Sequence, residues 1–277
     1  MSVVTEAALT GLKAVYDRDG WCEISYRFTE QAVALLKERV TANSQERRPE
    51  VVYEKDSDTV RGIHGCHAFD DAFDALVRHP QLVALAEELT GRPVYVYQFK
   101  VNLKQAREGA AWPWHQDYAF WSEEDGMPGA HAVNIALSLD DIHEGNGPLV
   151  VLPGSHRLGL LDLPEKEQEG GSAWQQHVAV DLAYTVSEER AEKLAAEFGR
   201  VLITGKAGTV HAFHPSIVHS SSSNISPDRR ALLLITYNAV DNAPENPTRP
   251  EFLVTRDSTR VTPVSDDRLG LELLPPA

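Results

Sequence analysis

The chain has 277 residues, with 26 basic and 41 acidic side chains and a formal net charge of −15. Nucleic-acid and anionic-membrane surfaces need clustered Lys and Arg, so we expect a small-molecule substrate, no nucleic acid, no membrane and no obligate protein partner. The only two cysteines are far apart, the N-terminus lacks a basic segment followed by an apolar one, and no run of 18 apolar residues occurs, so a cytoplasmic protein is expected.

The first third of the chain is predicted to be largely helical. Amphipathic patterns cover residues 5–19 and 29–42, the second with Thr29 as its N-cap, and another helical pattern covers residues 70–90. A short strand is expected after Gly20, and a charged loop over residues 43–58. In the segment 59–67, Arg61 and His64 alternate with small or apolar residues, so they either reach a ligand or are satisfied polar groups of a loop.

Strands are predicted from residue 93 onward. Residues 94–102 alternate as a strand should, which places Gln98, Lys100 and Asn102 on one face with Val94 and Val96. That polar face either meets solvent or lines a wet pocket. The remaining expected elements are strands at 132–139, 149–152, 201–203, 208–213 and 230–238, and a capped helix at 187–199.

These elements favour a mainly β fold with flanking helices, namely a double-stranded β-helix or cupin-like jelly roll. No repeat or long linker divides the sequence. We therefore expect a single domain over residues 1–277, in which a helical N-terminal part, about 1–92, packs on a jelly-roll core, about 93–240.

The aromatic stretch 111–121 contains a His-x-Asp pair, His115 and Asp117. In an extended strand, residues i and i+2 project from the same face, so both side chains can bind one metal while Gln116 points away. The best third ligand is His219, where an apolar stretch ends in a polar turn. Two histidines and one carboxylate on one face of a metal are the ligands that non-haem iron(II) oxygenases use.

Arg230 follows His219 by eleven residues and opens an apolar run. An arginine at the start of a buried strand needs an anion. It forms either a structural salt bridge or a bidentate clamp for the carboxylate of a ligand, and the neighbouring metal motif favours the clamp.

The order His-x-Asp, His and then Arg resembles the phytanoyl-CoA dioxygenase superfamily of Fe(II)/2-oxoglutarate oxygenases. Within it, further motifs are similar to the bacterial hydroxylases of free L-amino acids, above all those that act on proline. Ectoine hydroxylases share several of these motifs. The motifs are residues 61–67, 94–102, 112–118, 124–127, 146–149, 236–238 and 249–253.

The resemblance implies Fe(II) at His115, Asp117 and His219, with 2-oxoglutarate and O2 as cosubstrates and ascorbate as a supporting reductant. It places Arg230 on 2-oxoglutarate, with further residues nearby: Asn102, Asn134, Trp112 and Ser221. Substrate contacts are expected from Gln98, Lys100, Tyr118, Trp121 and His64, and we add Arg61 as a cation on the side where an amino-acid carboxylate enters. The implied reaction converts L-proline to trans-4-hydroxy-L-proline with release of succinate and CO2.

Several alternatives stay open at this point. The substrate is otherwise free leucine, another small aliphatic amino acid or an ectoine-like zwitterion. A carrier-bound or CoA-linked substrate would call for a basic docking surface, and no Lys/Arg cluster is evident. A halogenase is disfavoured by Asp117. A non-catalytic, zinc-binding jelly roll would need a fourth protein ligand, and only three are identified.

Overall fold

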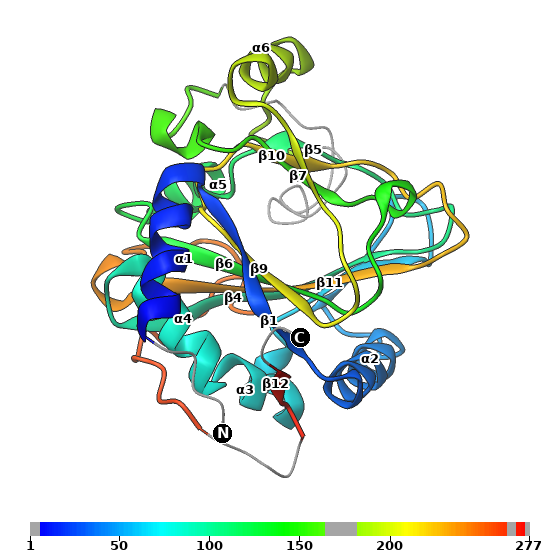
Figure 1. Ribbon diagram of the computed structural model, residues 1–277. Coiled ribbons are helices and arrows are strands. Elements are labelled where there is room, and N and C mark those ends of the chain that lie inside the picture. Colours follow the sequence, from blue (N-terminus) through cyan, green and yellow to red (C-terminus); the bar gives the residue numbers. More distant parts are fainter. Residues whose placement is uncertain (1–5, 164–181, 265–269, 275–277) are drawn as a thin grey trace.

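The computed structural model describes residues 6–163, 182–264 and 270–274. Its strands form two antiparallel sheets that face each other (Figure 1), so the predicted mainly β jelly roll with flanking helices is confirmed. The large sheet consists, in spatial order, of β12 (Leu273–Leu274), β1 (Trp21–Phe28), β9 (Thr209–Phe213), β6 (Ala132–Ser138), β11 (Arg230–Ala239), β4 (Val94–Lys104), β3 (Val60–His64) and β2 (Val51–Tyr53). The small sheet consists of β5 (Trp112–His115), β10 (His219–Ser221), β7 (Leu149–Val151) and β8 (Val201–Ile203).

The helices lie mostly outside the two sheets. They are α1 (Glu6–Asp19), α2 (Glu30–Ser44), α3 (Asp71–Val77), α4 (Pro80–Thr90), α5 (Asp117–Asp125) and α6 (Glu188–Phe198). Helix α4 packs against β4, β6 and β11, and α1 packs against α4 and β1, so the main hydrophobic core lies between these helices and the large sheet (Figure 1). Among the described residues, no helix combines the length and apolar character that crossing a membrane requires.

The N-terminal part is less purely helical than predicted. Three strands of the large sheet come from it, and β1 lies between β12 and β9. The expected short strand after Gly20 extends over eight residues because alternate side chains from Trp21 to Phe28 are buried. The large sheet therefore contains strands from both the first and the last parts of the chain.

The single helix predicted over residues 70–90 is two helices. Asp70 caps α3 by accepting a hydrogen bond from Ala72 N, and α4 begins at Pro80. Proline suits the first helical position but disfavours a helical residue before it, and His79 is extended (φ −60°, ψ 125°). By contrast, Thr29 caps α2 as predicted, with its hydroxyl 3.1 Å from Ala32 N.

Strand β4 supplies the polar face that was noticed in the sequence, but with a break. Gln98 pairs with Thr236 and Val96 with Tyr237, so the register shifts by one residue at this point. Val94 and Val96 consequently pack toward the main core, whereas Gln98, Lys100 and Asn102 line a pocket between the sheets. The prediction that these three residues line a pocket is confirmed. The prediction that they share a face with Val94 and Val96 is wrong, because the extra residue of the β-bulge turns the side chains that come after it to the other face of the sheet.

Candidate metal centre and its pocket

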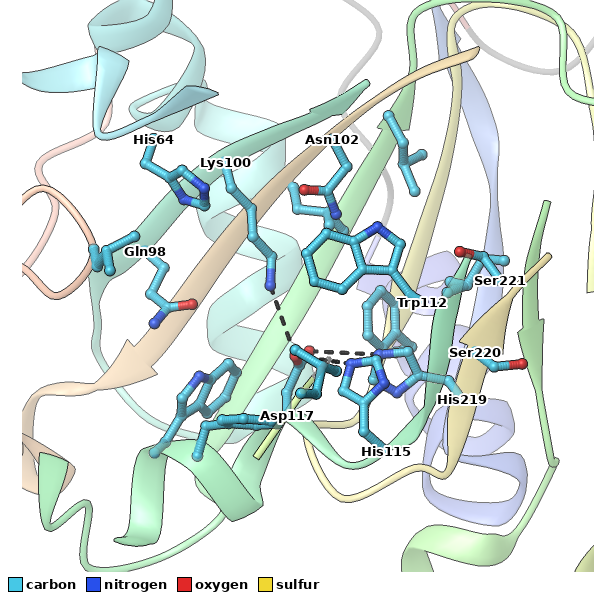
Figure 2. Close-up of a pocket in the computed structure, with 18 of the residues that line it drawn as sticks. His64, Gln98, Lys100, Asn102, Trp112, His115, Asp117, His219, Ser220 and Ser221 are labelled. Carbon is cyan, nitrogen blue, oxygen red and sulfur yellow. Dashed lines mark ion pairs between the residues drawn. The ribbon is translucent and has the colours of Figure 1, made fainter. Parts of the chain in front are cut away.

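Three buried side chains in the jelly roll form a metal-binding group. His115, Asp117 and His219 each offer one ligand atom, and these atoms lie within 4.8 Å of one another. Figure 2 shows the three side chains converging at the base of the pocket. Among the residues that the structure describes, no other group of histidine, cysteine and acidic side chains meets this criterion.

The backbone brings the three ligands together differently from the prediction. Strand β5 ends at His115, Gln116 is extended, and Asp117 is the first residue of α5, so the expected strand does not reach Asp117. His219 lies directly opposite His115 in the β10–β5 pair. The carboxylate at the helix N-terminus interacts favourably with the helix dipole, which gives the helix a physical reason to begin there.

Gln116, between the two ligands, holds neighbouring loops. Its amide nitrogen donates to Gly159 O at 2.9 Å and to Ser216 O at 2.6 Å, and its oxygen accepts from Leu161 N at 2.9 Å. The side chain is fully buried and all of its polar atoms are used. Gln116 therefore fixes the turn that joins the strand to the helix.

Both imidazoles are oriented by backbone carbonyls. His115 Nδ1 lies 2.7 Å from Pro113 O, and His219 Nδ1 lies 3.0 Å from Ile217 O. Burial, followed by the neighbouring His219, lowers the pKa of His115 to about 3, and burial also lowers the pKa of His219. At neutral pH both rings are uncharged, and a proton on Nδ1 leaves Nε2 free to bind a metal.

Asp117 is held from two sides. Asn134 Nδ2 donates to its Oδ2 at 2.8 Å, and Lys100 Nζ lies 3.6 Å from its Oδ1. Burial alone would raise the pKa of Asp117, but Lys100, the two imidazoles and Asn134 lower it to about 2. The carboxylate is therefore ionised and oriented at neutral pH.

Asn134 has a different neighbour from the one expected. It is absent from the pocket lining, and Thr236 Oγ1 donates to its Oδ1 at 2.6 Å while its amide reaches Asp117. All three side chains are buried. Asn134 was expected near 2-oxoglutarate, and its hydrogen-bond partner in the structure is the metal ligand Asp117 rather than a group in the open pocket.

One end of the pocket suits a carboxylate. Arg230, the first residue of β11, donates from Nε and Nη2 to Gly147 O at 3.2 and 2.8 Å, whereas its Nη1 has no hydrogen-bond partner. Ser221 Oγ is also buried without a partner, and both residues line the pocket. An unsatisfied buried donor costs about 1–3 kcal/mol, so a carboxylate that accepts from both groups fits this end. Burial lowers the pKa of Arg230 to about 10, which leaves it a cation at neutral pH.

Gly147 makes this arrangement possible. Its φ is +78°, and a Cβ would lie 2.5 Å from Ser222 O and 2.8 Å from Lys104 Cδ. Lys104, a buried residue that the sequence analysis did not single out, donates from Nζ to Ser222 O, and burial lowers its pKa to about 6. The glycine therefore allows the backbone carbonyl that holds Arg230 to lie beside this lysine.

The other end of the pocket carries different polar groups. In Figure 2, His64 and Gln98 lie on the opposite side of the metal ligands from Ser220 and Ser221, with Lys100 extending toward Asp117. His64 lies opposite Lys100 in the β3–β4 pair, and Arg249 lines the same pocket. Burial lowers the pKa of His64 to about 3, with further lowering by Lys100 and Arg249. The pocket has polar groups at both ends, with the metal ligands between them.

Arg249 is a pocket residue to which the sequence analysis assigned no role. It is 6% exposed and lies after β11 in a segment without a helix or strand, where no periodic pattern marks it. Its Nε and Nη2 donate to Asp125 Oδ1 and Oδ2 at 3.0 and 2.5 Å, and Asp125 raises its pKa despite burial. The motif 249–253 was the only sequence signal for it.

Most of the predicted site residues meet in this one pocket. Its space, together with the open volume at its mouth, is about 800 Å³. Beyond the metal ligands, the predicted residues that line it are His64, Gln98, Lys100, Asn102, Trp112, Trp121, Ser221 and Arg230. Phe120, Leu182 and Leu253 add apolar wall.

Two predicted substrate contacts lie elsewhere. Arg61 is 2% exposed, is bonded to Glu54 at 3.0 Å, and stacks with its guanidinium carbon 3.9 Å from the ring centroid of Trp112. It lies behind that wall instead of at the entrance, because a buried arginine pairs with the nearest carboxylate. Tyr118 is absent from the lining and donates to Met127 O at 3.3 Å.

Comparisons with known proteins agree with this geometry. The family model described as phytanoyl-CoA dioxygenase (PhyH) matches residues 16–232. L-proline trans-4-hydroxylase of Streptomyces griseoviridis is 54% identical over 264 residues, which cover 95% of this chain and 98% of that protein. Ectoine dioxygenase of Bordetella parapertussis is 34% identical over 256 residues, which cover 88% of this chain and 81% of that protein.

Solved structures give the same picture. The crystal structure of EctD from S. alaskensis with 2-oxoglutarate and 5-hydroxyectoine has a TM-score of 0.79 at 30% identity, covering 95% of this chain and 88% of that one. The structure of EctD from S. alaskensis with bound Fe has a TM-score of 0.78 at 30% identity, with the same coverage.

Proposed function

Because this chain belongs to the phytanoyl-CoA dioxygenase family, we propose that it hydroxylates free L-proline at C4, giving trans-4-hydroxy-L-proline. It is an Fe(II)/2-oxoglutarate-dependent dioxygenase that acts on an amino acid. The choice of proline is supported by the 54% identity to L-proline trans-4-hydroxylase over nearly the full length of both chains.

The donor groups described above fit the two cofactors. His115, Asp117 and His219 would hold Fe(II), and Arg230 with Ser221 would hold a carboxylate of 2-oxoglutarate, satisfying the two buried donors that lack partners. When bound, the iron and 2-oxoglutarate would, with O2 as the oxidant, supply the chemistry that replaces one C–H bond by C–OH; one oxygen atom enters the product and the other enters succinate, with release of CO2. The remaining task of the protein is to bind and orient the amino acid and to exclude water.

The observation that carries the proposal is the pair of cationic ends in one pocket. Arg230 lies at one end. At the other, Lys100 lies opposite His64, and Arg249 is held through Asp125 to Tyr97, the neighbour of Gln98. A dicarboxylic cosubstrate requires only the first cation. The second end therefore offers a separate site for an amino-acid carboxylate, with Gln98 as a hydrogen-bonding group beside it, and we propose Arg249 as the principal cation there.

The pocket walls suit a compact ring. Trp112, Phe120 and Trp121 line it together with Leu182 and Leu253, and Trp121 is 1% exposed. An apolar wall binds the methylene carbons of proline while the charged end fixes the carboxylate. A long acyl thioester has no free carboxylate to place at this end of the pocket, so it would make no charge-assisted hydrogen bond there.

We also propose that residues 1–277 act as one catalytic domain. Strand β1, from the N-terminal part, is hydrogen-bonded to β9, which carries Phe213 of the pocket wall. His64 of β3 also lines the pocket. An isolated jelly-roll core beginning near residue 93 would lack these strands, which argues for a single unit.

The test is a substrate panel. Protein with Fe(II), ascorbate and 2-oxoglutarate is incubated with proline, leucine, pipecolate or ectoine, and succinate and the NMR spectrum of the product are measured. We expect proline-dependent succinate and trans-4-hydroxyproline. A larger response to leucine, pipecolate or ectoine would show that this compound, and not proline, is the preferred substrate. Turnover only with a carrier-bound or CoA-linked amino acid would overturn the free-substrate proposal.

A further inference from the structure

One helix connects the two ends of the catalytic pocket. Helix α5 begins with the metal ligand Asp117 and ends with Asp125, the carboxylate that binds Arg249. At 1.5 Å per residue, the eight steps between them span about 12 Å. The position of the Arg249 guanidinium relative to the metal ligands is thus tied to the length of a single rigid element.

Asp125 is placed to hold the guanidinium in one orientation. It is fully buried, and its two oxygens accept Arg249 Nε and Nη2 while its Oδ2 also accepts from the Tyr97 hydroxyl. A bidentate pair fixes the guanidinium plane as well as its position. The carboxylate therefore determines which edge of Arg249 is presented to the pocket.

The end of α5 that carries Asp125 is itself immobilised. Trp121, one turn earlier, packs edge-on against Tyr97 with ring centroids 5.3 Å apart. After Asp125 the helix ends at Gly126 (φ +69°), and Met127 N donates to Trp121 O at 2.9 Å. The other end is held through Asp117 by Asn134. A change in the length of the side chain at position 125 is therefore transmitted to Arg249 rather than absorbed by the helix.

We propose that Asp125 is a positioning residue that determines which carbon of the amino acid is hydroxylated, by fixing Arg249 at a set distance along α5 from the metal ligands. This rests on the proposed function, in which Arg249 binds the substrate carboxylate. Adjacent carbons of a proline ring lie about 1.5 Å apart, as ordinary C–C bonds do. A displacement of Arg249 of that order brings a different carbon next to the metal.

The competing explanation is that Asp125 only neutralises a buried arginine. A merely structural role predicts losses of stability and of rate but no change in the site of hydroxylation. Asp125→Glu separates the two, because it keeps the charge and both oxygens while it adds one methylene. Asp74→Glu is the matched control, since Asp74 forms an i,i+4 ion pair with Arg78 on the surface.

The measurement is the distribution of hydroxyproline isomers by NMR, together with the ratio of succinate to hydroxylated product. For Asp125→Glu we expect an about tenfold loss in the rate of trans-4 product, a new regioisomer, and a several-fold rise in succinate per product. Iron binding should stay unchanged, and Asp74→Glu should match the wild type. In Arg249→Lys, the Michaelis constant for proline should rise while that for 2-oxoglutarate does not.

The outcomes separate this proposal from the proposed function. If wild-type protein hydroxylates proline and Asp125→Glu gives the same single product with unchanged succinate stoichiometry, the positioning role is wrong and the proposed function stands. If wild-type protein turns over another free amino acid, the proposed substrate is wrong; a changed regioisomer of that product in Asp125→Glu would still support the positioning role, and an unchanged one would overturn it. If it turns over no free amino acid, both proposals are overturned.

Discussion

Replacing Asn134 by Ala should weaken iron binding far more than 2-oxoglutarate binding. The Asn134 amide donates to Asp117 Oδ2 at 2.8 Å, and its oxygen accepts from Thr236 at 2.6 Å, so it orients the carboxylate ligand from the side away from the pocket. Removing such an orienting partner of a metal ligand typically lowers metal affinity by about 10–100-fold. That range corresponds to about 1.4–2.7 kcal/mol.

The substitution should also cost stability. It leaves the Thr236 hydroxyl and one Asp117 oxygen buried without a hydrogen-bond partner, and each such group lowers the free energy of unfolding by about 1–3 kcal/mol. Thr236→Val is the matched comparison, because it breaks only the outer hydrogen bond and leaves the one to Asp117. We expect its iron affinity to be close to that of the wild type.

Anaerobic calorimetric titration with Fe(II) measures the affinity, and the Michaelis constant for 2-oxoglutarate at saturating iron measures the cosubstrate site. If Asn134→Ala binds iron as the wild type does but loses 2-oxoglutarate affinity, the amide contacts the cosubstrate after all and the role assigned from the structure is wrong. Equal loss of iron affinity in Thr236→Val and Asn134→Ala would show that the whole chain of hydrogen bonds acts as a unit.

Three other outcomes are expected. Arg230→Lys should raise the Michaelis constant for 2-oxoglutarate about tenfold or more, because an ammonium group cannot hold Gly147 O and present a further donor to the carboxylate in the same fixed geometry. An unchanged constant in steady-state assays would mean that 2-oxoglutarate binds elsewhere. Arg61→Met should lower the free energy of unfolding in urea by about 3–5 kcal/mol, because the Glu54 carboxylate loses its cationic partner and keeps, among the described residues, only the Ala110 amide. Partial recovery is expected when Glu54 is also changed to Gln, and a loss under 1 kcal/mol in the single variant would contradict this. The metal-free protein should lose stability from pH 6.5 to 5.5, because burial lowers the pKa of His67 and His211 to about 4 and of His214 to about 3. Over that interval these histidines gain protons in the unfolded state but not in the folded state, which lowers the free energy of unfolding by about 1 kcal/mol per histidine. The same free energy of unfolding in urea at pH 6.5 and pH 5.5 would refute this prediction.

Much of the architecture follows from local patterns in the sequence. Periodicity located most of the longer elements, and the caps at Thr29 and Ser187 act as predicted because capping depends on neighbouring residues alone. The three metal ligands were identified because their residue types and order already restrict the chemistry. Contacts across the fold were harder to predict, since local patterns in the sequence do not tell which side chain lies opposite which.

Particular residues show this limit. Asn134 and Arg61 are both polar, inward-facing residues near the site, and sequence gave no means of telling a ligand contact from a contact with Asp117 or Glu54. The β-bulge at Gln98 depends on pairing with β11, a strand more than a hundred residues later. Arg249 lies outside regular structure, and only the tertiary contact with Asp125 makes it a pocket residue.

The antiparallel pair of β5 and β10 bears on how readily the protein is degraded. These two strands share only two register pairs, His219 with His115 and Ser221 with Trp112, with an irregularity between them. β5 is also the edge strand of its sheet. An ion held by His115 and His219 would add a third link between segments distant in the chain, and at a hundred times its dissociation constant it stabilises the folded state by about 2.7 kcal/mol. Iron-starved protein should therefore open first at this edge, so that local unfolding exposes the tryptophans of β5 to proteases and makes iron supply a determinant of enzyme lifetime.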